Sequence, residues 1–258
     1  MADALLHVEN VGKRFGGFTA LDGINLEVAP GERVGLIGPN GSGKSTLVNC
    51  MCGTLTNETG SVRFDGHEMN GLAAHQRTHR GMARSFQLPR PFHTLSVAEN
   101  LRIPLLYTAH SRRGGHLSQA ESASRCEELA GLVGLAPKLH RLPRDLTQVE
   151  MRKLELARAI AADPKLLIAD EAMAGLSHSE VDDIVNLLLT LNGRGITVVM
   201  IEHIMQAVMS LAEQVFVLSE GRIIAQGTPK DIAADPHVIE AYLGHGAAAR
   251  IAAGAVHA

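Results

Sequence analysis

The sequence is poor in aromatic residues, in cysteine and in long apolar runs, and these shortages exclude several classes of protein. Aromatic residues make up 3% of the 258 residues, and tryptophan is absent. Three cysteines (Cys50, Cys52 and Cys126) fit a reducing compartment rather than a disulfide scaffold, and we interpret them as buried thiols. No uncharged apolar stretch reaches the roughly 18 residues that a membrane-spanning helix needs.

Charge is nearly balanced, which excludes a further class. The net charge of −3 gives no electrostatic case for binding nucleic acid. The 13 histidines form no cluster with the spacing of metal ligands. Residues 1–6 lack the basic region and the apolar core of a signal peptide. We therefore expect a cytoplasmic globular protein, whose membrane role, if it has one, is peripheral and depends on a partner.

The most specific pattern in the chain is a glycine-rich segment. It fits G-x-x-x-x-G-K-[ST] without a mismatch. An apolar run of strand type (34–37) precedes it, and a predicted helix (45–52) that Gly53 ends follows it. This context disfavours a chance glycine-rich turn. We call this segment the phosphate loop, and it consists of Gly38, Pro39, Asn40, Gly41, Ser42, Gly43, Lys44, Ser45 and Thr46.

The residue types of the phosphate loop suit the binding of ATP with Mg²⁺. Glycines let the backbone wrap closely around an anion, and successive N–H groups at a helix N-terminus then point at phosphates. Lys44 would reach the β- and γ-phosphates, and the Ser45 hydroxyl would bind Mg²⁺. A GTP switch is the weaker alternative, because the chain has no Asn-Lys-x-Asp motif to read guanine.

Two adjacent carboxylates follow a second apolar run. Residues 165–169 are predicted to form a buried strand that leads into Asp170 and Glu171. Asp170 would hold Mg²⁺ through water, and Glu171 would act as general base on the attacking water. Acids at a strand end can also be merely solvated, but the phosphate loop favours the catalytic interpretation.

Other candidate residues have weaker local signals. Phe15 precedes a glycine pair and suits either stacking on a base or a place in the core, and local sequence leaves both open. Gln87 follows a predicted strand (81–86), which means little by itself.

Thr147 and Glu150 have capping-box spacing at a helix that runs to about residue 162, and this is either a second anion site or an ordinary capped helix. His203 ends a strand, where ligands bind in open α/β sheets.

The remaining periodicities predict an α/β fold. Strands over 5–8 and 24–28 alternate apolar and polar residues, and a hairpin over 215–225 closes the chain. Residues 88–162 are helical in pattern, with amphipathic helices over 96–106 and 118–133. The alanine- and glycine-rich segment 245–258 is expected to be a frayed tail.

Taken together, the ordered motifs resemble the ATP-binding-cassette (ABC) ATPases over almost the whole chain, from about residue 5 to 244. The resemblance implies a RecA-like P-loop NTPase core with an N-terminal antiparallel β layer and an inserted helical subdomain. It also implies that Phe15 stacks on adenine, that Gln87 touches Mg²⁺ and water, and that His203 contacts the γ-phosphate. Ser177 falls at a loop that crosses the dimer interface in that family.

Within the family, the chain is similar to the ATPases of branched-chain amino acid uptake systems. The similarity lies in Ala83-Arg84-Ser85-Phe86-Gln87, in Ile201-Glu202-His203-Ile204-Met205 and in the C-terminal run Val238-Ile239-Glu240-Ala241-Tyr242-Leu243-Gly244. The chain departs from the family at two places. The signature Leu-Ser-Gly-Gly-Gln is Leu146-Thr147-Gln148-Val149-Glu150 here, and Ala172 stands where a proline usually follows the catalytic glutamate.

The resemblance further implies partners. Two ABC ATPase subunits, identical or paralogous, would sandwich two MgATP molecules, and Thr147 would serve the ATP bound by the other subunit. Transmembrane permease subunits and, indirectly, a periplasmic substrate-binding protein would complete an importer at the inner face of the cell membrane. The alternatives are an ABC exporter subunit, for instance for lipid, and a soluble ABC protein that acts in DNA repair or translation.

Overall fold

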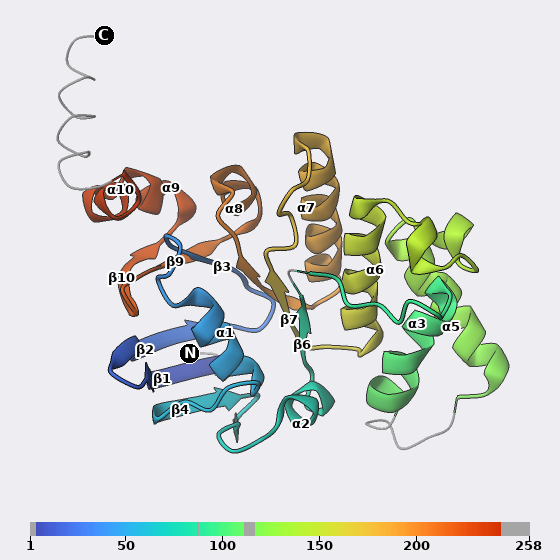
Figure 1. The fold of residues 1–258 in the computed structure, drawn as a ribbon, viewed down its shortest axis with the longest axis horizontal. Coiled ribbons are helices and arrows are strands. Elements are labelled where there is room, and N and C mark those ends of the chain that lie inside the picture. The colour runs from blue at the N-terminus through green and yellow to red at the C-terminus, as the bar shows by residue number, and fades with distance from the viewer. Residues whose placement is uncertain (1–3, 87, 111–116, 244–258) are drawn as a thin grey trace, which may run out of the picture. The chain divides into compact units, whose positions relative to one another are not determined.

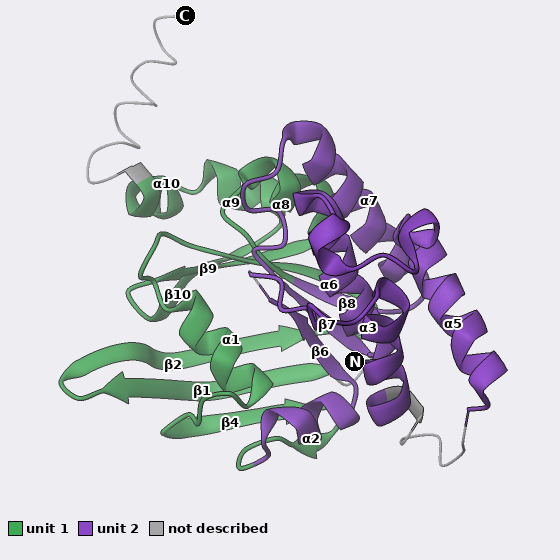
Figure 2. Cartoon of the chain, turned by 45° about the vertical axis from the view of Figure 1, so that its right-hand side comes forward, with its two compact units in different colours: residues 1–71, 200–258 green, residues 72–199 purple. Residues whose placement is uncertain are grey.

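The computed structural model describes residues 4–86, 88–110 and 117–243. The chain forms two compact units, which Figure 2 distinguishes by colour. Unit 1 comprises residues 1–71 and 200–258, and unit 2 comprises residues 72–199. Gln87 and the predicted tail over 245–258 lie outside the described residues. Each unit is described by itself below.

Unit 1 contains an antiparallel sheet, which confirms the predicted N-terminal β layer (Figure 1). Its strand order is β2-β1-β4-β5. Leu6 of β1 pairs with Val28 of β2 and with Phe64 of β4, and all three side chains are buried. The strands are β1 (Leu6–Phe15), β2 (Phe18–Val28), β4 (Thr59–Phe64) and β5 (His67–Glu68).

The first two strands are longer than the sequence predicts. The register of β1 against β2 shifts after Val8, Val11 and Lys13, and Asn10 has a positive φ of 50°. Each such bulge moves the following side chains to the other face of the sheet, so the alternation of apolar and polar residues breaks although the strand continues. This explains why the sequence predicts strands only over 5–8 and 24–28 in this part of the chain.

A second group of strands in unit 1 carries the phosphate loop. β3 (Arg33–Ile37) runs parallel to β9 (Gln214–Ser219), and β9 forms an antiparallel hairpin with β10 (Arg222–Gly227). The predicted closing hairpin is therefore confirmed. The helices of this unit are α1 (Lys44–Cys52), α8 (Met205–Leu211), α9 (Pro229–Ala234) and α10 (Pro236–Leu243).

Unit 2 combines parallel strands with most of the helices that the described residues form. β6 (Met82–Ser85) pairs in parallel with β7 (Leu166–Asp170), and the order is β8-β7-β6. β8 (Thr197–Ile201) crosses the boundary of the two units. The helical elements are α2 (Ala74–His79), α3 (Val97–Pro104), the π-helical η1 (Leu105–His110), α5 (Gln119–Leu132), the short η2 (Ala136–Lys138) and η3 (Pro143–Asp145), α6 (Gln148–Ala161) and α7 (His178–Gly193).

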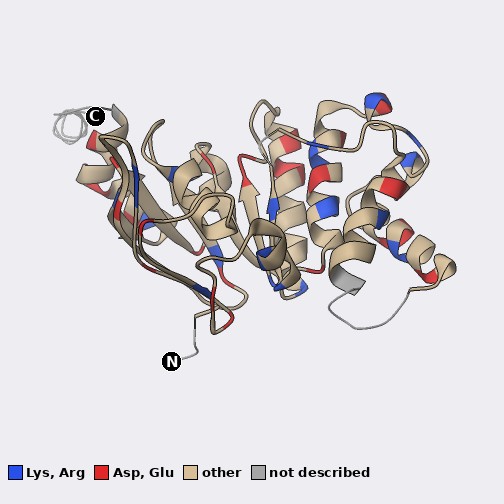
Figure 3. Cartoon of the chain, turned by 60° about the horizontal axis from the view of Figure 1, so that its bottom comes forward, with Lys and Arg blue, Asp and Glu red and all other residues tan. Residues whose placement is uncertain are grey.

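Capping residues set the starts of three helices in unit 2, and the sequence predicts the cap at Thr147. Ser96, Ser118 and Thr147 are the N-caps of α3, α5 and α6, and each accepts a hydrogen bond from the backbone N–H three residues on. Acidic and basic side chains are interspersed along these helices (Figure 3), and some form pairs such as Arg125 with Glu128 at 2.9 Å. The predicted helix over 96–106 ends sooner as an α-helix, at Pro104, and continues as η1.

The cysteines and the apolar helices have the properties that the sequence predicts. Cys50, Cys52 and Cys126 are buried free thiols, as predicted. Within the described ranges, no helix is both long enough and apolar enough to cross a membrane.

Candidate functional site

The phosphate loop links the end of β3 to the start of α1 in unit 1. Its glycines are required by close approach as well as by conformation. A Cβ on Gly38 would lie 2.0 Å from the carbonyl oxygen of Leu218, and a Cβ on Gly43 would lie 2.7 Å from that of Ala20. Gly43 also has a φ of 109°, which side chains disfavour. The loop therefore has the strand–turn–helix context that the sequence predicts.

The Lys44 side chain is folded back into the loop. It is buried, and its Nζ donates to the carbonyl oxygens of Gly38 at 2.7 Å and Pro39 at 3.0 Å. These carbonyls stabilise the ammonium group where water is excluded. Phosphate oxygens can take over the same donors, so Lys44 is held in place for an anion at the start of α1.

The turn of the β9–β10 hairpin supports the phosphate loop from one side. Glu220 and Gly221 both have positive φ (48° and 76°), as a two-residue type I′ turn requires. The Gly221 N–H donates to the Ser42 carbonyl at 2.9 Å, and its own carbonyl accepts from Asp22 N–H at 2.8 Å. The hairpin thus fixes the backbone of the loop at Ser42.

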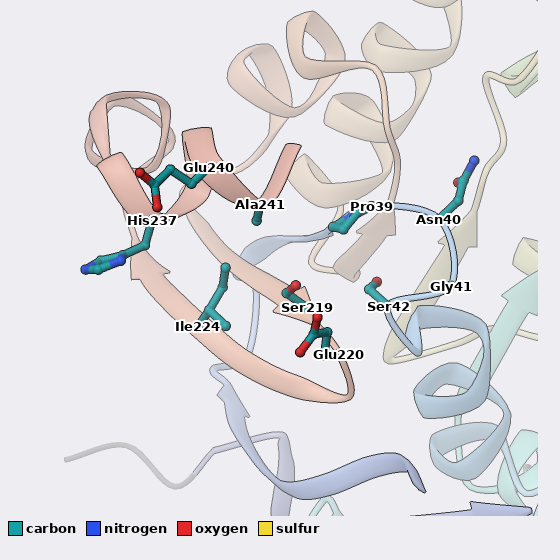
Figure 4. A pocket seen from close by; sticks show the side chains of 10 residues that line it. All are labelled: Pro39, Asn40, Gly41, Ser42, Ser219, Glu220, Ile224, His237, Glu240 and Ala241. Carbon is teal, nitrogen blue, oxygen red and sulfur yellow. The ribbon is translucent and has the colours of Figure 1, made fainter. Parts of the chain in front are cut away.

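Helix α10 lies at the same loop. Residues of both line a cavity of about 790 Å³, and Figure 4 shows the side chains around it. The cavity is lined by Pro39, Asn40, Gly41, Ser42, Ser219, Glu220, Ile224, His237, Glu240 and Ala241. Partial burial raises the pKa of the Tyr242 hydroxyl above its usual range, and the nearby Gly38 backbone partly offsets this rise. The sequence indicated Tyr242 only as part of a C-terminal pattern, not as a neighbour of the phosphate loop.

Two further candidates in unit 1 lie near the surface. Phe15 ends β1 and is 49% exposed, so the interpretation as a core residue is wrong. Lys13 Nζ lies 5.5 Å from the centre of the Phe15 ring. His203 follows β8, and its side chain is largely exposed. Stacking of Phe15 on a base and contact of His203 with a phosphate stay predictions.

In unit 2, the two adjacent acids differ in surroundings. Asp170 is the last residue of β7 and is buried, which excludes a merely solvated carboxylate. Its Oδ2 accepts from Arg84 Nη2 at 2.5 Å, and Arg84 belongs to the neighbouring strand β6. In the sequence, Arg84 belongs only to a run that resembles the family pattern, because nothing local links it to a residue 86 positions away.

Glu171 leaves the strand in an unusual conformation. Its φ of 46° lies in the left-handed region, which costs a residue with a side chain about 1 kcal/mol or more. Such strain is found preferentially at functional sites. The next residue is Ala172, at the position where the family usually has a proline, and its side chain is buried.

Thr147 caps α6, but the N-terminus of this helix already holds a negative charge. The Glu150 carboxylate accepts from Thr147 N–H at 2.7 Å and from Lys138 Nζ at 2.7 Å. Burial alone would raise the pKa of Glu150, but these hydrogen bonds, first of all that from Lys138, lower it below its usual range. The Gln148 side chain lies against Gly175, 3.0 Å from where a Cβ would be. The predicted capping box is therefore confirmed.

Comparisons with known proteins show the family to which the chain belongs. A family model for the ABC transporter matches residues 21–174, and one for the branched-chain amino acid ATP-binding cassette transporter matches residues 222–248. The high-affinity branched-chain amino acid transport ATP-binding protein BraF of Pseudomonas aeruginosa is 36% identical over 257 residues, which cover 95% of this chain and 99% of BraF.

Solved structures agree with the sequence matches. The ADP conformation of an ATP-binding cassette of an ABC transporter is 31% identical, with a TM-score of 0.82 over 95% of this chain and 100% of that one. A dimeric post-hydrolysis state of another ATP-binding cassette, bound to ADP and Pi, is 27% identical, with a TM-score of 0.78 over 87% of this chain and 98% of that one. The chain therefore belongs to the ABC transporter family, among its nucleotide-binding ATPase cassettes.

Proposed function

We propose that this chain binds and hydrolyses ATP as a subunit of an ABC transporter that imports branched-chain or related amino acids across the inner membrane. The observation that carries the ATPase is the phosphate loop, which holds the buried Lys44 ammonium at the start of α1. The substrate class is inferred from BraF, whose name states branched-chain amino acid transport, and from the match at residues 222–248.

The phosphate loop would bind the triphosphate. Its backbone N–H groups and the N-terminus of α1 would face the phosphate oxygens. Lys44 Nζ would exchange one of its two carbonyl acceptors for a phosphate oxygen and so stabilise the charge that develops during hydrolysis. Phe15, which is half exposed, would stack on the adenine ring.

The chain also offers oxygen ligands of the kind that Mg²⁺ prefers. The Ser45 hydroxyl lies in the first turn of α1, and the Asp170 carboxylate ends β7. Both side chains offer oxygen, which Mg²⁺ prefers to nitrogen and sulfur as a ligand. The chemistry of these residues therefore fits this ion. Ser45 would bind it directly and Asp170 through water, with Gln87 as a further contact. When bound, Mg²⁺ neutralises charge on the phosphate oxygens.

Glu171 would polarise the attacking water as general base. Its strained backbone sets the direction of the side chain just beyond the strand. His203, at the end of β8, would contact and orient the γ-phosphate. These roles follow the family pattern residue by residue.

The partners we propose follow from the family as well. A second ABC ATPase subunit, identical or paralogous, would complete each ATP site, as in the dimeric cassette bound to ADP and Pi. Transmembrane permease subunits would receive the motion, and a periplasmic substrate-binding protein would deliver the amino acid. The chain would then lie at the inner face of the cell membrane. No nucleic acid takes part in this function.

ATP hydrolysis by the purified chain tests the proposal, with mass in solution followed in parallel. The wild type is expected to hydrolyse ATP, and Glu171→Gln is expected to bind ATP but to lose turnover by about a hundredfold or more. Glu127→Gln on the exposed face of α5 is the matched control and should be unchanged. Absence of ATP binding to the wild type would refute the proposal. Leucine uptake into vesicles that hold the assembled transporter then tests the substrate class.

A further inference from the structure

The cavity between the phosphate loop and α10 has the size of a site for a small organic ligand, and its lining is acidic. Its volume of about 790 Å³ falls within the range of ligand pockets, about 300–1,000 Å³. Glu220 of the β9–β10 turn and Glu240 of α10 both line it. No lysine or arginine is among the described residues of the lining. A cleft whose charges have one sign attracts ligands of the opposite sign, so the cavity favours a cation.

Neither carboxylate of the cavity is neutralised by a neighbouring side chain. In the part of the chain that the structure describes, Glu220 and Glu240 form no ion pair. Arg222 begins β10, but its guanidinium is bound to Asp22, with Nε 2.9 Å from Oδ2. His237 of α10 also lines the cavity, and Figure 4 shows its ring directed away from the other side chains. Both carboxylates can therefore bind a cationic ligand.

The two carboxylates lie on opposite sides of the cavity, and apolar side chains lie between them. In Figure 4, Glu240 belongs to α10 above the space and Glu220 to the hairpin turn below it. Ile224 and Ala241 lie between the two, and the Ile224 side chain is 38% exposed. Two separated negative charges with an apolar surface between them match an aliphatic diamine, in which a methylene chain joins two ammonium groups.

A buried hydroxyl of the phosphate loop adds a polar group to the same cavity. Ser42 is 3% exposed and lines the cavity, and its Oγ has no hydrogen-bond partner among the described residues. Figure 4 shows the side chain directed from the loop towards Ser219 and Glu220 of the hairpin. A buried hydroxyl without a partner costs free energy. An ammonium group of a ligand can donate the missing hydrogen bond.

We propose that this cavity is a binding site for a small aliphatic diamine or polyamine. One ammonium group would bind Glu240 and the other Glu220, with the Ser42 hydroxyl as a further acceptor. The methylene chain would cover Ile224. The ligand would thereby join α10 to the turn whose Gly221 N–H holds the Ser42 carbonyl. This site goes beyond the proposed function and does not depend on it.

Calorimetric titration of the intact chain with putrescine tests the site. The titration is done without nucleotide, because an amine also binds to the triphosphate of ATP. We expect saturable binding with a dissociation constant on the order of 1 mM or lower, which suits a ligand of this size. Butylamine has the same carbon chain but a single ammonium group, and it should bind about tenfold more weakly.

Substitutions at the two carboxylates locate the binding on the chain. Glu240→Gln and Glu220→Gln each remove one negative charge with little change of shape. Each should weaken putrescine binding about threefold to tenfold. Glu127→Gln removes an exposed carboxylate of α5 and is the matched control, which should keep the wild-type dissociation constant. Glu220 has a positive φ of 48° in the turn, so Glu240→Gln, in a helix, decides the test if Glu220→Gln folds poorly.

The outcomes separate a built site from attraction to the overall negative charge. The site is refuted if putrescine shows no saturable binding, or if Glu240→Gln binds it as tightly as the wild type. An equal loss of affinity in Glu127→Gln also refutes it. Equal binding of butylamine and putrescine would overturn the assignment to diamines. A loss confined to the two cavity variants supports the site. ATP binding, measured separately on the same preparation, decides whether the proposed function stands.

Discussion

The backbone N–H of Gly221 donates to the carbonyl oxygen of Ser42 at 2.9 Å, so a hairpin turn near the C-terminus holds the phosphate loop near the N-terminus. This bond depends on the turn keeping its shape. Gly221 has a φ of 76°, and a Cβ at this position would lie 2.7 Å from the Ala20 carbonyl oxygen. The turn therefore has no room for a side chain.

Replacing this glycine is expected to disturb nucleotide binding. Gly221→Ala combines left-handed strain with a backbone clash, so it should lower the free energy of unfolding by about 2–4 kcal/mol and weaken ATP binding. Gly66→Ala is the matched control, because Gly66 also has a φ of 76° but meets no atom within 4 Å. The control should cost about 1 kcal/mol and leave ATP affinity unchanged. Chemical denaturation and equilibrium ATP titration measure the two effects. Equal loss of ATP affinity in both variants would argue against a specific role of the turn.

Tyr242 of α10 is expected to contribute to ATP affinity through the phosphate loop. Partial burial raises the pKa of its hydroxyl, and the nearby Gly38 backbone only partly offsets this rise, so the hydroxyl is neutral under ordinary assay conditions. Tyr242→Phe removes the polar group that faces the Gly38 backbone and should weaken ATP binding about threefold. Tyr107→Phe, at an exposed position of η1, is the control. An unchanged dissociation constant in Tyr242→Phe would show that α10 does not position the loop.

The sequence predicted the parts of the site that depend on contiguous residues. The phosphate loop, the acids at the end of β7 and the capping box at Thr147 each follow from short patterns, and the structure has the expected elements around them. Arg84 and Tyr242 could not be recognised in this way. Their partners, Asp170 and Gly38, are distant in the chain and meet only because strands and helices pack together. The full length of β1 was hidden for a related reason, since bulges break its period.

Glu150 should make the stability of the chain depend on pH. Its hydrogen bonds from Lys138 and Thr147 lower its pKa, so its stabilising effect is present above the unfolded-state pKa and is lost as the pH falls through the folded-state pKa. We expect Glu150→Gln to lower the free energy of unfolding by about 1 kcal/mol at pH 7. The difference from wild type should vanish at acid pH, below the usual range of a glutamate.

A second capping box provides the control for this prediction. Glu99 occupies the same position in α3, but its carboxylate binds Ser96 rather than a lysine. Added salt screens ion pairs between partly exposed groups, so it should reduce the effect of Glu150→Gln more than that of Glu99→Gln, on whose carboxylate Arg102 acts only weakly. Urea denaturation at two pH values and two salt concentrations measures this. Salt-independent loss in Glu150→Gln would exclude a contribution of Lys138.

The altered signature at the start of α6 is expected to limit hydrolysis in a dimer of this chain. Gln148 and Val149 stand where the family has glycines, and the Gln148 side chain lies against Gly175. Removing both side chains, by Gln148→Gly with Val149→Gly, would let a phosphate approach the first N–H groups of α6 more closely. We expect ATP turnover per dimer to rise about tenfold, even though two glycines cost the helix about 1 kcal/mol each. Gln119→Gly with Ala120→Gly makes the same change in the first turn of α5 and should not raise turnover. If turnover of the signature variant stays at the wild-type level while the chain still dimerises with ATP, crowding at α6 is not the limit, and the search for a paralogous partner with its own signature becomes the next step.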